Sequence, residues 1–149
     1  MIKKISVWIL CLSIFSIQHL NAEEKFLSLK NNKTNVRYGP GLDYPIKYIY
    51  RKVNLPVKLI DKKENMRRVI FLDNNSGWIH RSQLKQSNSI ITTKEKILFK
   101  KPSNFSEPFA RLETGRLLVI KKCESDWCYV ATDNYKGWIK SKNVWGSAK

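Results

Sequence analysis

The sequence contains an internal repeat with an offset of about 60 residues, and a repeat of this length limits the chain to a small unit that is built twice. The tripeptide Gly-Trp-Ile at residues 77–79 recurs at residues 137–139. Two apolar runs and a turn precede each copy, at residues 56–60, 66–71 and 73–77 and again at residues 116–120, 127–131 and 133–137. Each unit closes on an apolar residue, at Leu84 and Val144.

The residue types within each unit predict short β-strands. Val, Ile, Tyr and Phe dominate the apolar runs, and Gly, Asn, Asp and Pro separate them. No segment after residue 25 shows a sustained helical period. We therefore expect an all-β protein with two tandem small barrels at residues 26–85 and 95–147, whose linker at residues 86–94 is short enough for the barrels to touch. The expected core residues are Val36, Val57, Leu59, Val69, Ile79 and Leu84 in the first unit and Leu98, Leu112, Leu118, Ile120, Val130, Ile139 and Val144 in the second.

The N-terminal segment predicts export. Lys3 and Lys4 precede an apolar run at residues 5–17, and Ala22 follows before the chain becomes charged. This order is typical of a secretory signal peptide, here residues 1–22, and the run is shorter than the roughly 20 residues that a transmembrane helix needs. We expect a periplasmic or secreted protein; an uncleaved N-terminal anchor is the alternative.

The charge of the chain favours anionic partners. The formal net charge is +16, and removal of Lys3 and Lys4 with the signal peptide leaves 26 − 12 = +14. Export argues against nucleic acid as the partner, which leaves anionic envelope polymers and at most peripheral contact with a membrane. The cations are spread along the chain, so a solvated basic surface without a specific partner explains them equally well.

Cys123 and Cys128 have a spacing that fits opposite strands of one hairpin. Because disulfides persist in oxidising compartments, we expect a bridge between them, and two reduced, partly buried thiols are the alternative. The spacing is not the C-x-x-C of redox proteins. The exported part of the chain holds a single histidine, His80, so we expect neither a metal site nor a cofactor.

The segment Asn-Val-Arg-Tyr-Gly-Pro-Gly at residues 35–41, followed by Asp-Tyr-Pro-Ile at residues 43–46, resembles the opening signature of bacterial SH3 domains. The resemblance covers about residues 28–146 and is greatest to the variant that occurs as tandem pairs in exported proteins of Gram-negative bacteria. It implies two SH3-like β-barrels. Two departures stand out: Met66 occupies a position that is usually Trp, and residues 97–102 lack the two turn glycines.

The sequence supports no reaction, and we expect a binding protein without catalytic residues. His80 follows a strand where a solvated side chain is expected, and the few acidic residues lie mostly in turns. The resemblance implies recognition of peptidoglycan or cell-wall peptides. An arginine fork beside aromatic rings suits an extended peptide and its carboxylate. The candidate ligand-binding residues are Arg37, Tyr38, Tyr44, Tyr48 and Trp78.

Three alternatives stay open. The aromatic residues of the candidate site are explained as well by packing of the barrel. The protein could instead be a periplasmic adaptor whose partner is an envelope protein. Addition of a strand to an exposed sheet edge is one way to bind such a partner. A weaker alternative is electrostatic binding of anionic lipid or polysaccharide.

Overall fold

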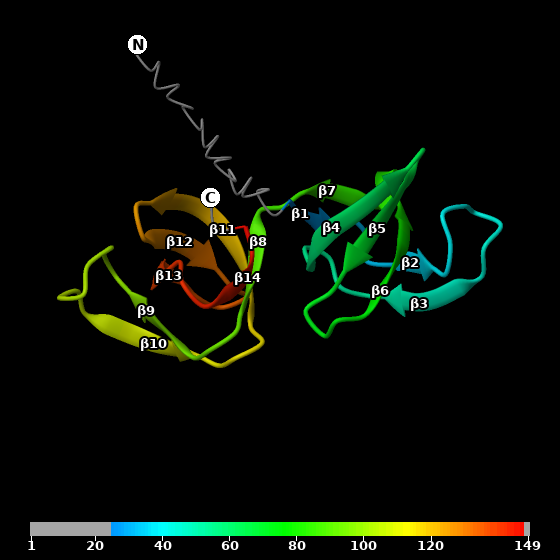
Figure 1. Ribbon diagram of the computed structural model, residues 1–149. Helices are drawn as coiled ribbons and strands as arrows, with labels where there is room; N and C mark the ends of the chain where they lie inside the picture. The colour runs from blue at the N-terminus through cyan, green and yellow to red at the C-terminus, as the bar shows by residue number, and fades with distance from the viewer. Residues whose placement is uncertain (1–24, 148–149) are drawn as a thin grey trace, which may run out of the picture.

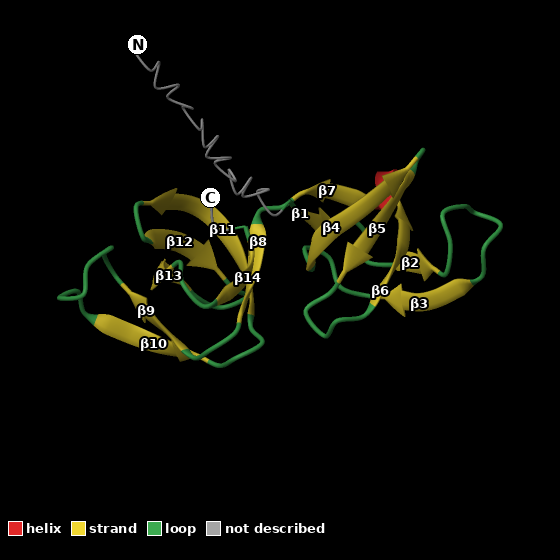
Figure 2. Cartoon of the chain, in the orientation of Figure 1, coloured by secondary structure: helices red, strands yellow, loops and turns green. Residues whose placement is uncertain are grey.

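The computed structural model describes residues 25–147, which form two seven-stranded antiparallel sheets, each curled into a small barrel (Figures 1 and 2). The predicted all-β class with two tandem barrels is confirmed. The predicted signal peptide at residues 1–22 lies outside the described residues. Within residues 25–147, no helix is long and apolar enough to cross a membrane.

The first barrel contains strands β1–β7 and one short 3-10 helix, η1 (Arg81–Gln83). The strands lie side by side in the order β3-β2-β6-β5-β4-β1-β7. Their bounds are β1 (Phe26–Leu29), β2 (Thr34–Arg37), β3 (Ile46–Tyr50), β4 (Pro56–Lys63), β5 (Met66–Ile70), β6 (Ser76–His80) and β7 (Leu84–Gln86).

The second barrel contains strands β8–β14 in the order β10-β9-β13-β12-β11-β8-β14, which is the strand order of the first barrel repeated. The sequence repeat is thus a repeat of topology. The bounds are β8 (Ser89–Thr92), β9 (Lys96–Phe99), β10 (Pro108–Leu112), β11 (Leu117–Glu124), β12 (Trp127–Ala131), β13 (Lys136–Lys140) and β14 (Val144–Gly146).

Each barrel has its own apolar core, and all the expected core residues belong to it. Most of them are buried, whereas Leu59, Leu84, Ile120 and Val144 are half-buried and pack against the buried cluster. The sequence analysis missed four buried members, Leu29, Phe71, Ile90 and Cys128.

The structure differs from the expected linker at residues 86–94. Strand β8 lies inside this range, all four of its residues are buried, and it pairs with β11 and β14. Only residues 87–88 connect the two barrels. β8 begins and ends with a polar residue, which in the sequence is typical of an exposed linker. Both residues can be buried because the hydroxyls of Ser89 and Thr92 donate to the backbone carbonyls of Asn54 and Glu113.

The two barrels touch through polar and aromatic contacts, as their short connection predicts. The fully buried hydroxyls of Ser28 and Ser89 lie 2.7 Å apart, which joins β1 to β8. The indole of Trp145 donates to the carbonyl of Pro56 at 3.2 Å and meets the ring of Phe26 edge to face at 5.2 Å. Buried hydrogen bonds tolerate little change in geometry, so these contacts hold the barrels in one mutual orientation.

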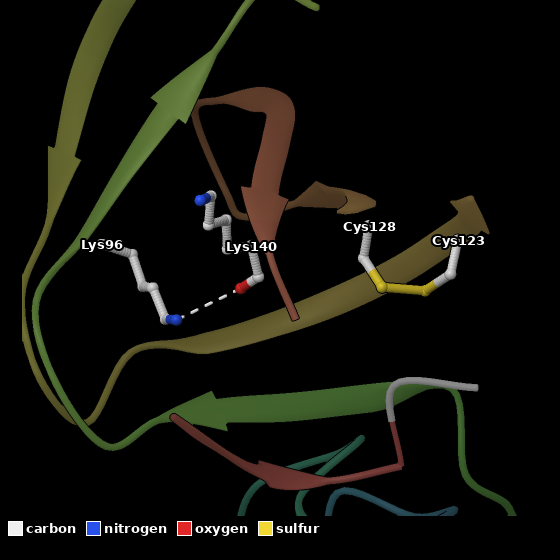
Figure 3. The surroundings of a disulfide bond; sticks show 4 residues. All are labelled: Lys96, Cys123, Cys128 and Lys140. Atoms are coloured by element: carbon white, nitrogen blue, oxygen red, sulfur yellow. Dashed lines mark hydrogen bonds between the residues drawn. A yellow bond between two sulfur atoms is a disulfide. The ribbon is translucent and has the colours of Figure 1, made fainter. Parts of the chain in front are cut away.

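A disulfide joins Cys123 and Cys128, which face each other across the β11–β12 hairpin as predicted (Figure 3). Nearby in the same barrel, the buried ammonium group of Lys96 donates to the carbonyl of Lys140 at 3.1 Å and to that of Lys142. Burial lowers the pKa of Lys96 below its ordinary value of 10.5. The amine is held by carbonyl groups at the end of β13, which gives it a structural role.

Candidate ligand-binding site on the first barrel

A row of three side chains crosses three neighbouring strands of the first barrel. Trp78 in β6 pairs directly with Arg37 in β2 on one side and with Arg68 in β5 on the other. Residues that lie directly opposite each other in an antiparallel pair point to the same face of the sheet. The sheet therefore presents an indole between two guanidinium groups.

This row forms part of a pocket of about 300 Å³, which we call the cationic pocket. Its lining is polar, and it combines residues of β2, β5 and β6 with Lys47 from β3 and Tyr38, which follows β2. The lining residues are Arg37, Tyr38, Lys47, Arg68, Ser76, Gly77 and Trp78.

Two of the three cations of the pocket, Arg37 and Lys47, are oriented by backbone carbonyl groups. Arg37 donates to the carbonyl of Tyr44 at 2.6 Å, and the ammonium of Lys47 donates to the carbonyl of Ser76 at 3.1 Å. The same ammonium lies 5.6 Å from the ring centroid of Tyr38. Within residues 25–147, no carboxylate forms an ion pair with Arg37, Lys47 or Arg68. Three like charges around one hollow favour an anionic ligand.

The structure brings together three of the five predicted site residues. Arg37, Tyr38 and Trp78 line the pocket, and Tyr38 is the most exposed of them, at 64%. Tyr44 and Tyr48 do not line it.

Tyr44 and Tyr48 have structural contacts instead. The ring of Tyr44 lies over Gly39, where any β-carbon would collide with it, and its carbonyl anchors Arg37. Tyr48 packs against the apolar core, and its hydroxyl donates to the side chain of Asn75 at 3.2 Å. Both tyrosines therefore shape the site from outside the pocket.

The sequence analysis missed Lys47 and Arg68. Arg68 reaches the site through its register with Trp78, which the regular pairing of the β5–β6 hairpin sets. Lys47 lies at a bulge, opposite the Val36–Arg37 step of β2. Alternation of residue types does not reveal the bulge at Lys47, whereas Arg68 could have been found by pairing β5 with β6 across the turn that joins them.

The second barrel has the same row with different chemistry. Trp138 in β13 pairs with Phe99 in β9 and with Tyr129 in β12, so aromatic rings replace both arginines. Trp138 is 7% exposed, and the ammonium of Lys122 lies 4.9 Å from its ring centroid. The row is therefore packed in the second barrel and open to a charged ligand in the first.

The site has no features of a metal centre in the described part of the chain. Residues 25–147 contain no group of three or more His, Cys, Asp or Glu side chains that could hold an ion. His80 is engaged locally, since its Nδ1 lies 2.7 Å from the hydroxyl of Ser82 and accepts from the backbone N–H of the same residue.

Two small barrels of one topology, with a cationic pocket on the first, define a tandem β-barrel protein. A sequence model described as a bacterial SH3 domain matches this chain twice, at residues 30–86 and 93–146. The protein belongs to the bacterial SH3 domain family.

Comparison with known proteins adds little beyond the family. No curated protein matches the sequence. Two similar solved structures are NlpC2 and NlpC1 from Trichomonas vaginalis, each with 13% identity and a TM-score of 0.38. The alignments cover 83% of this chain and 48% and 46% of those chains, so this chain spans about half the length of each. At this identity and TM-score, the likeness says nothing about function.

Proposed function

We propose that this protein is a non-enzymatic component of the bacterial cell envelope that binds peptidoglycan, or the peptides of peptidoglycan, through the cationic pocket. The observation that carries the proposal is the group of three cations beside Trp78 and Tyr38, none of them paired with a carboxylate in the described part of the chain. The N-terminal signal that the sequence predicts would place the protein in the periplasm or outside the cell.

The geometry suits a peptide that carries carboxylates. Arg37 is held by the carbonyl of Tyr44, so little side-chain entropy is lost when its remaining N–H groups bind an anion. Arg68 is exposed on the other side of Trp78, so the two guanidinium groups can take two carboxylates, or both ends of one carboxylate-bearing segment. The indole between them offers an apolar surface to the aliphatic part of the same segment.

A second candidate function is that of an adaptor that binds an envelope protein. Strand β3 lies at one end of the strand order of the first barrel, and its Ile46 and Ile49 are 42% and 47% exposed. A partner strand that paired with β3 would cover these side chains and complete the hydrogen bonds of the edge.

The proposal is tested by co-sedimentation of residues 23–149 with purified peptidoglycan sacculi, from low salt to about 0.5 M, where exposed charges interact only over a few ångströms. We expect saturable binding that persists in part at high salt. Arg37→Ala and Arg68→Ala should each weaken it about tenfold, because a charge-assisted hydrogen bond contributes about 1.5–3 kcal/mol.

The matched control is Arg51→Ala, which removes an exposed arginine of the same barrel that does not line the pocket. This variant should bind within about twofold of wild type, because an exposed charge outside the pocket contributes only to the overall positive charge of the protein. Equal losses in all three variants would show a diffuse electrostatic effect, and the absence of pelleting at any salt would leave the adaptor as the better hypothesis.

A further inference from the structure

A second hollow lies where the two barrels meet, and we call it the inter-barrel cleft. It has a volume of about 240 Å³, and its lining is mostly apolar. Six of its residues come from the first barrel, and Ile91 comes from β8 of the second. The lining residues are Tyr50, Leu55, Pro56, Phe71, Leu72, Asp73 and Ile91.

The walls of the cleft are fixed by contacts on both sides. The rings of Tyr50 and Phe71 stack with centroids 4.0 Å apart and an angle of 10° between their planes. Pro56 is held to the second barrel by the hydrogen bond from Trp145, and β8 is held to the first barrel by the buried hydroxyl of Ser89. The docked second barrel therefore completes the cleft, and its shape is set before any ligand arrives.

One charge stands at the rim of the cleft, and it is negative. Asp73 is the only charged residue of the lining, in a chain whose net charge is strongly positive. Its carboxylate accepts from the backbone N–H of Asn75 at 3.0 Å and from the side-chain amide at 2.7 Å, so its position is fixed. Burial and, after it, the nearby Asp73 carboxylate raise the pKa of the Tyr50 phenol, whose side chain lines the same cleft.

We propose that the inter-barrel cleft binds an organic ammonium ion whose apolar body is one ring or a short alkyl chain. The apolar body fits because the volume lies below the roughly 300–1,000 Å³ of sites for larger ligands. The ammonium group fits because an aromatic pair and a carboxylate attract the same charge. The cleft is thus opposite in charge preference to the cationic pocket and independent of the proposed wall binding.

The test uses three probes of nearly equal size that differ in charge: phenethylammonium, phenethyl alcohol and 3-phenylpropionate. Each is titrated into ¹⁵N-labelled protein (residues 23–149), and amide shifts are followed by NMR. We expect the ammonium probe to bind most tightly, about three- to fivefold tighter than the alcohol, which is the range that one exposed ion pair supports. Shifts should appear together at Leu72 of the first barrel and Ile91 of the second.

Two variants sharpen the result. Asp73→Asn keeps an acceptor for the turn but removes the charge, and it should make the ammonium probe bind no better than the alcohol. Asp133→Asn is the matched control, because Asp133 lies in the corresponding turn of the second barrel, away from the cleft. Equal binding of all three probes to the wild type, or shifts confined to the cationic pocket, would overturn the proposal.

Discussion

Gly77 and Gly137 open the two copies of the Gly-Trp-Ile repeat, yet the structure predicts that they respond differently to substitution by alanine. A β-carbon on Gly77 would collide with the Cγ1 atom of Val36 and lie 2.9 Å from the carbonyl oxygen of Arg37. Val36 is completely buried and β-branched, so its side chain has little freedom to move away. The carbonyl belongs to the ladder that places Arg37 in the cationic pocket.

A β-carbon on Gly137 would meet the ring of Phe109 at 2.8 Å and the carbonyl of Phe99 at 3.1 Å. Phe109 is 39% exposed, so its ring can swing outward at little cost. Both glycines have ordinary backbone angles, and alanine in such a place gains about 0.4–1 kcal/mol by restricting the unfolded chain.

The expected change in the free energy of unfolding is the cost of overpacking minus the entropic gain of alanine. Overpacking of a closed core costs about 1–3 kcal/mol, so Gly77→Ala should destabilise the first barrel by about 1–2 kcal/mol after the entropic gain. Gly137→Ala should change the free energy of unfolding by less than about 0.5 kcal/mol, because the ring of Phe109 is mobile and the carbonyl of Phe99 needs to shift only slightly.

The assay is urea unfolding of both variants, with amide hydrogen exchange at Ile79 and Ile139 to report on each barrel separately. Gly77→Ala should increase exchange at Ile79 and leave Ile139 unchanged. Equal destabilisation by the two substitutions, or a larger effect of Gly137→Ala, would refute the packing argument.

Two further predictions concern the second barrel. Replacing Cys123 and Cys128 together by alanine should lower the free energy of unfolding by about 2 kcal/mol, the loop-closure value for a separation of 5 residues, and dithiothreitol should have a similar effect on the wild type in denaturant titrations but none on the variant. The pKa of Lys96 is lower in the folded state than its ordinary value of 10.5, so between these two values the unfolded chain binds more protons than the folded chain. The free energy of unfolding of the wild type, relative to that of Lys96→Met, should therefore rise as the pH increases through this interval. Parallel pH profiles of the two proteins in thermal unfolding would contradict this assignment.

The strands and the core could be predicted from the sequence because they depend on local alternation. Val36, Val69 and Ile79 are buried, and the residues on either side of each are polar or at least partly exposed. This alternation is enough to predict which face of the strand points into the core. The pairing of Cys123 with Cys128 was equally local, because a hairpin turn joins the two residues.

The candidate site was only partly predictable, because it depends on register between strands that are distant in sequence. Arg37 and Trp78 are 41 positions apart (78 − 37), and their pairing is set by the sheet and not by either segment. A bulge then brings Lys47 to the site, and the β5–β6 hairpin places Arg68 beside Trp78. Strand β8 was missed for another reason: Ser89 and Thr92 look like solvent-exposed residues until the carbonyls that accept their hydrogen bonds are known.

The buried serine contact between the barrels has a mechanical consequence. It fixes the direction in which the second barrel extends once the first is held by a ligand. The β2–β3 loop, next to the cationic pocket, and the β9–β10 loop lie at opposite ends of the molecule (Figure 1). A surface that holds the first loop therefore leaves the second pointing away from it, with the fully exposed ring of Phe105 near its tip. Because the barrels are docked, the fold sets the separation and the relative direction of these two loops.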